Sequence, residues 1–264
     1  MKVTVRCSEL GKAMSRTRDR KTMGDTAKRV FINSFNRQAF QKYAEFSSKQ
    51  TEKGDLCEPE AVIFISEKTG YVLSKYDGPE LRNDWITGTP DALYLTKGIV
   101  DHVHEVKNSY TSESHFNKWS DGLSAEHKAQ VKGYCFLNQV GTGTVHHCLM
   151  NSPETQVNDA LKNQYFKSKE DPELWEEIYT IGNMMYDRKS FIQMCERLGR
   201  LPVDKKSLAM FRGFVEIPEE LRYFKFDVEF TSEDEKQIIE SVNEGNRFLQ
   251  TQEFYKLYLH SCNL

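Results

Sequence analysis

The feature that most constrains the fold is a pair of strand-like stretches joined by a very short connection. Ile86–Leu95 and Ile99–Lys107 have the composition of strands, and Thr96-Lys97-Gly98 links them. A connection of this length that contains Gly is typical of a β-hairpin. The chain is therefore expected to build its core around an antiparallel pair of strands.

Helices are expected before this hairpin. Asp25 is placed to cap one whose apolar residues recur at helical spacing, namely Phe31, Phe35, Phe40, Tyr43 and Phe46. The polar stretch 47–54 is interpreted as a connector. A second helix is expected over Glu58–Lys68, with Pro59 in its first turn and Gly70 just past its end, followed by a strand over Tyr71–Lys75.

The elements expected after the hairpin complete a mixed core. First come a polar loop over Ser109–Gly122, a helix capped by Ser124 that reaches about Leu137, and a buried strand over Thr144–Met150. The chain is then expected to be mostly helical from Pro153 to Leu201. A strand near Tyr223–Phe230 follows, and a Ser232–Glu235 capping box begins the final helix. The order helix, three strands, helix, strand predicts an α/β fold with a mixed central sheet flanked by helices. Because no convincing linker interrupts it, the whole chain, 1–264, is interpreted as one domain, with an arm (1–53), a core (54–150) and a helical extension (151–264).

Charge is distributed unevenly along the chain. The net charge is −3, but residues 1–50 hold 12 Lys+Arg against 4 Asp+Glu, whereas residues 51–264 hold 24 against 35. A basic arm on an acidic body suits a phosphate-binding segment, and a solvated helix face is the ordinary alternative.

Several classes of protein are disfavoured. The longest apolar run, Ala61–Ile65, is far shorter than the roughly 20 residues of a membrane-spanning helix, and the polar start lacks the pattern of a signal peptide, so a cytoplasmic protein with no membrane partner is expected. No Cys-x2-Cys pair suggests a zinc or iron–sulfur site, and reduced, buried thiols are expected at Cys7, Cys57, Cys135, Cys148, Cys195 and Cys262.

The chemically informative residues lie in the hairpin. Asp91 precedes Glu105-Val106-Lys107 by fourteen residues. Side chains alternate along a strand, so Glu105 and Lys107 point to one face, and Asp91 on the preceding strand can approach Glu105. Two close carboxylates suit a Mg²⁺ or Mn²⁺ ion, and a lysine beside such an ion can orient water or stabilise charge on a phosphoryl oxygen. The pattern favours metal-assisted hydrolysis of a phosphodiester. The alternative is an ordinary surface hairpin with an ion pair, because such a hairpin can have the same sequence pattern.

Two further patterns flank the hairpin. Gly54-x3-Glu58 places a carboxylate near the start of the preceding helix, and Glu60 competes for its role, because residues two apart on a helix face different ways. Gln130 and Tyr134 are four residues apart and share one face of the following helix. The histidine pairs are interpreted as structural, since His146 and His147 face opposite ways, and His102 and His104 share the face opposite Glu105.

This ordered set resembles the PD-(D/E)XK nuclease superfamily, here as Pro90-Asp91 and Glu105-Val106-Lys107. Gln130-x3-Tyr134 is similar to the QxxxY motif of its RecB-like and lambda-exonuclease-like branch, which includes the YqaJ-type phage recombinases. Gly54-x3-Glu58-x2-Ala61, ending at Thr69-Gly70, is similar to that branch's first core helix. The resemblance covers about residues 54–150 and implies a restriction-endonuclease-like core with helical additions at both ends.

The resemblance also implies roles for individual residues. Asp91, Glu105 and the Val106 carbonyl would bind the divalent metal, Glu58 would complete its shell, and Lys107 would serve the nucleophilic water. Gln130 and Tyr134 would organise the site. The family's 5′-phosphate pocket matches no specific positions, and by charge alone the candidates are Arg16, Arg18, Arg20, Lys21, Lys28 and Arg29.

The function implied is that of a Mg²⁺-dependent DNA exonuclease of the phage recombination type, acting on linear duplex ends. A single-strand annealing protein would be its partner, and some relatives form rings, so a homo-oligomer is a further expectation. A restriction or junction-cleaving endonuclease and an inactive nuclease-like DNA-binding module remain as alternatives.

Overall fold

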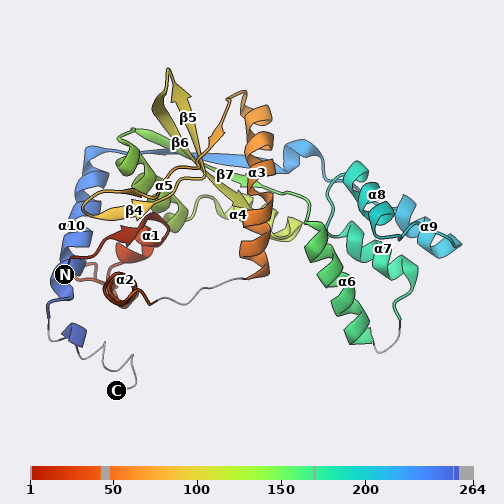
Figure 1. Cartoon of the computed structure of the whole chain (residues 1–264), viewed down its shortest axis with the longest axis horizontal. Coiled ribbons are helices and arrows are strands. Elements are labelled where there is room, and N and C mark those ends of the chain that lie inside the picture. The colour runs from red at the N-terminus through yellow and green to blue at the C-terminus, as the bar shows by residue number, and fades with distance from the viewer. Residues whose placement is uncertain (1, 43–47, 169–170, 252, 256–264) are drawn as a thin grey trace.

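The computed structural model describes residues 2–42, 48–168, 171–251 and 253–255 (Figure 1). It is built around a five-stranded sheet with the order β2-β5-β6-β7-β8. Only β6 and β7 run parallel, and the other neighbours are antiparallel. The strands are β2 (Ser74–Lys75), β5 (Ala92–Thr96), β6 (Ile99–Asn108), β7 (Thr142–Cys148) and β8 (Tyr223–Glu229). The expected α/β class with a mixed sheet is confirmed.

The β5–β6 hairpin also forms as expected. Thr96 pairs with Ile99, so Lys97 and Gly98 alone make the turn. Both have positive φ, 53° and 80°, which is the backbone of a two-residue hairpin turn.

The extent predicted for the first strand of this hairpin was wrong. Ile86–Leu95 forms two strands in two sheets, because Pro90 fixes φ and has no N–H to donate to a ladder. Its first part, β4 (Ile86–Gly88), lies between β1 (Val5–Arg6) and β3 (Leu81–Arg82) in a separate three-stranded sheet.

Two helices cover the two faces of the central sheet. On one face, Val131 of α5 (Ala125–Asn138) packs with Val103 and Val145. On the other, Ala61 of α3 (Lys49–Thr69) packs with Val106. Ser124 caps α5 as expected.

The preceding helix, α3, begins nine residues earlier than expected. The Ser48 hydroxyl accepts a hydrogen bond from the Thr51 N–H, so the predicted connector is helical from Lys49, and Pro59 lies in the helix interior. The loop expected over Ser109–Gly122 was also wrong, since it contains α4 (Ser112–Asp121), which opens with a reciprocal cap between Thr111 and Ser114.

The two ends of the described chain pack together beside α5. They comprise η1 (Cys7–Glu9), α1 (Leu10–Ala13), α2 (Asp25–Phe40) and α10 (Ser232–Phe248). Gly245 allows α10 to approach α2, because a Cβ there would lie about 2.1 Å from the Phe31 ring. The Asn246 side chain accepts a hydrogen bond from the Val3 N–H (2.7 Å) and donates one to the Val3 carbonyl (3.0 Å).

The expected caps of these end helices are each displaced by one residue. Gly24, not Asp25, precedes α2, and Asp25 is its first helical residue. The final helix is capped by Thr231 with Asp234 instead of Ser232 with Glu235. Of the aromatics predicted for α2, Tyr43 and Phe46 lie outside the described residues.

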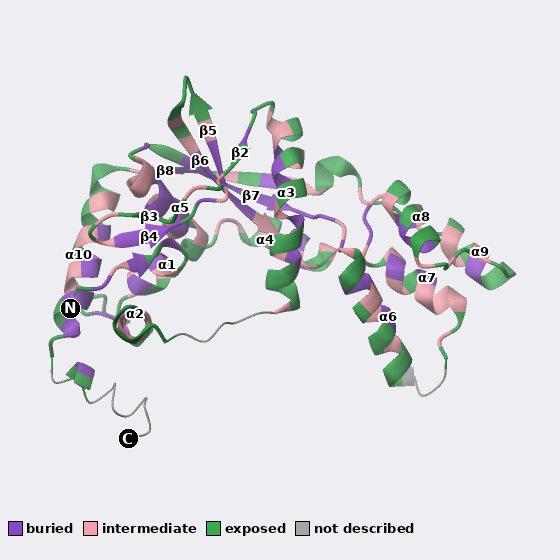
Figure 2. Ribbon diagram, viewed as in Figure 1, coloured by how far each residue is buried: buried purple, intermediate pink, exposed green. Residues whose placement is uncertain are grey.

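A helical lobe projects from one end of the sheet (Figure 1). It contains α6 (Glu154–Ser168), α7 (Leu174–Gly182), α8 (Arg188–Arg197) and α9 (Lys205–Arg212), and a separate set of buried apolar residues holds it together, including Val157, Ile178 and Phe191 (Figure 2). After η2 (Glu219–Leu221), the chain returns to the sheet as β8. The division at residues 53 and 150 stays a prediction.

The cysteine prediction holds for the described part of the chain. Cys7, Cys57, Cys135, Cys148 and Cys195 are free and buried, and Cys262 lies outside it. Within the described residues, no helix combines the length and apolar character needed to span a membrane.

Candidate functional site

The hairpin register places Asp91 beside Glu105. Ala92 pairs with His104, so Asp91, one residue before β5, lies opposite Glu105. The Val106 N–H donates a hydrogen bond of 2.6 Å to Asp91 Oδ2, and the Tyr76 N–H donates to the Asp91 carbonyl (3.0 Å). The backbone on both sides therefore fixes the position of this carboxylate.

Glu105 is buried, with 2% of its surface exposed, between the sheet and α5. Its Oε1 accepts hydrogen bonds from Lys107 Nζ and from Gln130 Nε2, the latter at 2.8 Å. Its Oε2 is buried without a hydrogen-bond partner. An unpaired carboxylate oxygen in a buried position is unfavourable unless a ligand satisfies it.

Burial and neighbouring charges shift the pKa values of all three ionisable groups, Asp91, Glu105 and Lys107. Burial, and then the neighbouring Glu105, raise the pKa of Asp91 well above its ordinary value. Burial likewise raises the pKa of Glu105. For Lys107, burial acts to lower the pKa, but Glu105 and Asp91 outweigh it and raise the pKa. The lysine therefore stays charged beside two carboxyl groups whose pKa values are raised.

Gln130 and Tyr134 share the face of α5 that covers Glu105, as their spacing predicts. The Gln130 amide donates both to Glu105 and to the Tyr134 hydroxyl, at 3.0 Å for the latter. Burial raises the pKa of Tyr134, so its hydroxyl stays protonated. This amide fixes one oxygen of Glu105 and leaves the other unengaged.

Glu58 lies at the edge of this site and Glu60 does not contribute to it. Glu58 is ion-paired with Lys75 (2.9 Å), and its charge helps to raise the pKa of Asp91. Glu60 is exposed and lines a small cavity beside the helical lobe, where Met194 is also found.

The donor set fits a divalent metal ion. Two carboxylates meet here, one with an orphaned buried oxygen, and oxygen ligands are those that Mg²⁺ and Mn²⁺ prefer. Among the described residues, no cluster of three or more His, Cys, Asp or Glu side chains is arranged to hold an ion, so Glu58 lies outside a ready-made ligand set. Any further ligands would be the Val106 carbonyl and water.

The six basic residues of the N-terminal region do not join this site. Arg16 is ion-paired with Glu244, and Lys28 with Glu253. The other four are exposed and have no ion pair within the described part of the chain; they are Arg18, Arg20, Lys21 and Arg29. Their role in phosphate binding stays a prediction.

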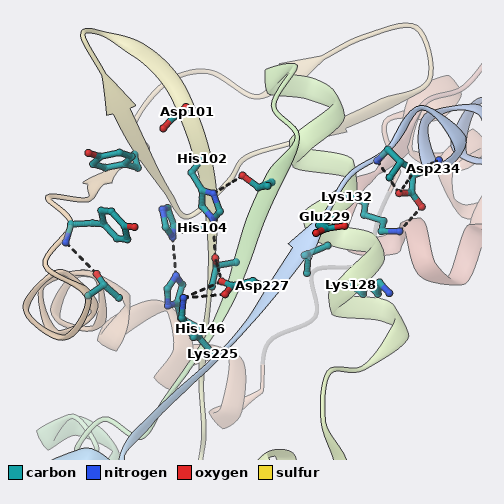
Figure 3. A pocket seen from close by; sticks show the side chains of 17 residues that line it. Asp101, His102, His104, Lys128, Lys132, His146, Lys225, Asp227, Glu229 and Asp234 are labelled. Atoms are coloured by element: carbon teal, nitrogen blue, oxygen red, sulfur yellow. Dashed lines mark hydrogen bonds and ion pairs between the residues drawn. The ribbon is translucent and has the colours of Figure 1, made fainter.

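The opposite face of the sheet holds a cavity of about 700 Å³ that sequence reasoning missed (Figure 3). His102 bonds to the hydroxyls of Thr142 and Thr144, both at 2.8 Å, and His104 Nδ1 lies 2.8 Å from His146 Nε2. Burial lowers the pKa of His104 to about 2 and that of His146 to about 3, so both are neutral. The histidines face away from Glu105 and Lys107, as expected.

Sequence reasoning also missed the basic and aromatic residues that α4 brings to the face of Lys107. Lys118 and Trp119 of α4 lie on this face, together with His127 and His147. The reciprocal cap at Thr111 and Ser114 was the local signal for the helix that carries the first two.

Comparison with known proteins gives structural neighbours only. No protein-family model matches the chain, and no curated protein matches its sequence. Its structure is similar to that of a phage-related exonuclease from Haemophilus somnus 129PT, with a TM-score of 0.61 and 17% identity over 99% of this chain and 97% of that one.

An alkaline exonuclease, LHK-Exo, from Laribacter hongkongensis is also similar, with a TM-score of 0.57 and 11% identity over 98% of this chain and 94% of that one. The same protein in complex with dAMP gives a TM-score of 0.57 at 12% identity. The chain has the fold of these exonucleases. At such identities the likeness concerns the fold, and the likeness extends over nearly the whole length of each chain.

Proposed function

We propose that this protein is a divalent-metal-dependent deoxyribonuclease of the PD-(D/E)XK type that degrades DNA from linear duplex ends. The observation that carries the proposal is the pairing of Asp91 with the buried Glu105, with one oxygen of Glu105 unsatisfied and a charged lysine alongside. The fold shared with two exonucleases supports the same activity class.

Asp91, Glu105 and the Val106 carbonyl would hold Mg²⁺ or Mn²⁺, with Glu58 at the rim. When bound, the ion would supply Lewis-acid polarisation of a phosphoryl oxygen and lower the pKa of a bound water. The protein's own part is to hold these ligands in place: the Val106 N–H orients Asp91, and Gln130 orients Glu105.

Lys107 has a separate role. Its ammonium group is hydrogen-bonded to the buried Glu105 carboxylate, and its side chain is 26% exposed, so a phosphodiester that approaches the site from solvent can meet this lysine. A fixed positive charge at that point stabilises the negative charge that develops on the phosphoryl oxygens and can orient the attacking water. Its raised pKa keeps it protonated for this task.

The finer features follow from the resemblance to lambda-type enzymes. We propose action at duplex ends in phage recombination, a cytoplasmic site of action, a single-strand annealing partner and a homo-oligomeric assembly. The dAMP complex of LHK-Exo is consistent with a site for a nucleotide product in this fold.

The deciding experiment compares linear and closed circular duplex DNA, each with Mg²⁺ and with EDTA. Metal-dependent loss of only the linear DNA is expected. Nicking of the circles would replace the exonuclease by an endonuclease. No cleavage of either DNA with Mg²⁺ or Mn²⁺ would leave the inactive DNA-binding module as the remaining alternative.

A further inference from the structure

The strand register extends the candidate site sideways across the sheet. Lys107 is paired with His147 on β7, and His147 is paired with Phe224 on β8. Neighbours paired in this way project from the same face. A row of three side chains therefore leads from the lysine of the site toward the edge strand.

Aromatic stacking continues this row to the molecular surface. The His147 and Phe224 rings are stacked, with centroids 4.7 Å apart and planes 9° apart. Trp119 of α4 also stacks on Phe224, at 5.4 Å and 23°, yet 43% of it is exposed. Phe116, one turn earlier on α4, is 38% exposed. Trp119 is thus partly open to solvent at the end of a stack that starts beside Lys107, and Phe116 is a second partly exposed ring on the same helix.

A second lysine lies close to this row without a counter-charge. Lys118 is partly buried and has no ion pair within the described residues. The acids of its own helix, Glu113 and Asp121, are exposed near the helix ends and do not pair with it. Burial, and then the charge of Lys107, lower the pKa of Lys118, so the two ammonium groups are near enough to repel each other. An anion between them would relieve both costs.

We propose that the exposed face of α4 is a subsite for an unpaired DNA strand, in which Lys118 binds a phosphate next to the one at Lys107 and Trp119 and Phe116 stack on bases. This inference rests on the proposed function and adds the form of the substrate. Aromatic rings reach base faces only where the bases are unpaired, and such stacking beside lysines is how proteins bind single strands.

The test measures binding apart from cleavage. Full-length protein in EDTA is titrated into a fluorescein-labelled single-stranded oligo-dT, and the anisotropy is recorded. Trp119→Ala is expected to weaken binding about tenfold, and Trp119→Phe, which keeps a ring on Phe224, to restore most of it. Trp175→Ala, in α7 of the lobe, is the matched control and should bind as the wild type does.

The phosphate contact has its own readout. Lys118→Gln should weaken binding and reduce the slope of log affinity against log salt by about 0.7, the value for one phosphate of a single strand. Lys128→Gln, an exposed α5 lysine without an ion pair in the described part of the chain, should leave the slope unchanged.

The outcomes separate this inference from the proposed function. If Trp119→Ala and Lys118→Gln both bind like the wild type while the wild type degrades linear DNA with Mg²⁺, the α4 subsite is wrong and the nuclease stands. Equal weakening by Trp119→Ala and Trp119→Phe would assign Trp119 to packing and also overturn the subsite. Weakened binding by a protein that cleaves no DNA would support the subsite and reject the nuclease.

Discussion

Alternate residues of β6 send Glu105 and Lys107 to one face of the central sheet and His102 and His104 to the other. On the histidine face, His102 has partners on both ring nitrogens and His104 is neutral. On the carboxylate face, burial and the neighbouring Glu105 raise the pKa of Asp91, and one oxygen of Glu105 has no partner. Each face thus holds a buried polar atom of β6 without a partner among the described residues, His104 Nε2 on one face and Glu105 Oε2 on the other. The imidazole is neutral, whereas a carboxylate oxygen is a ligand for a cation, so the carboxylate face is where a cation would gain most.

The largest expected effect breaks the carboxylate face. Lys107→Ala should lower the rate of linear DNA degradation by about 10²–10³-fold, because the fixed charge near the phosphoryl oxygens is lost. The rate is measured with Mg²⁺, and circular dichroism checks folding. The matched control, His102→Gln on the same strand, should stay within about threefold of the wild type. Equal losses in the two variants would contradict the distinction between the faces.

Metal binding should stabilise the protein through the residues of the carboxylate face only. At about 100 times its Kd, Mg²⁺ is expected to raise the free energy of unfolding by about 2.7 kcal/mol, because it binds the native carboxylates. Urea titrations with Mg²⁺ and with EDTA measure this gain. It should vanish in Asp91→Asn and persist in His102→Gln. A gain that survives Asp91→Asn would place the ion elsewhere.

Acid should destabilise the protein through its buried histidines, which include His104 and His146 on the histidine face and His147 beside Lys107. His104 has a folded pKa of about 2 against 6.5 ordinarily, so the folded protein binds fewer protons, and stability falls as the pH drops below about 6.5. Between pH 7 and 5 the loss is about 2 kcal/mol for each such histidine. Urea unfolding at several pH values should show a shallower slope for His146→Gln. An unchanged slope would mean that these imidazoles protonate freely in the fold.

The smallest expected effect concerns the support of Glu105. Tyr134→Phe removes the hydroxyl that accepts from Gln130 and should cost about 1 kcal/mol of stability, while Gln130 still donates to Glu105. Chemical denaturation measures the loss. Cleavage should change little, whereas Gln130→Ala should reduce it, because Glu105 then loses its orienting partner.

What the sequence could predict was mostly local. Alternation along β6 correctly separated Glu105 and Lys107 from the histidines, and the four-residue spacing correctly placed Gln130 and Tyr134 together. These inferences depend only on the period of a strand or a helix. The extent of α5 was predictable for a local reason too, its Ser124 cap. The hairpin was also predicted, but with a connection of three residues, whereas Thr96 pairs with Ile99 and only Lys97 and Gly98 make the turn.

What could not be predicted depends on contacts between distant segments. Pro90 ends one strand, but only the packing of β4 against β1 shows that the two halves enter different sheets. The segment that contains α4 is polar, and its apolar residues form no pattern strong enough to predict a helix. Trp119 of this helix stacks on Phe224, which is more than one hundred positions away, so the contact could not be predicted from the local sequence. The bond from Gln130 to Glu105 likewise required the sheet to be assembled.

The hydrogen bonds between Val3 and Asn246 have a consequence for biosynthesis. These bonds join the start of the chain to α10, so they form only when nearly the whole chain has been translated. In the same way, β8 pairs with β7 only after the whole lobe has been translated. Until β8 has been translated, the edge of β7 that pairs with β8 is exposed, and an exposed strand edge can pair with another chain and cause aggregation. The lobe, whose apolar residues pack among themselves, can become compact in that interval and keep its own chain out of the sheet.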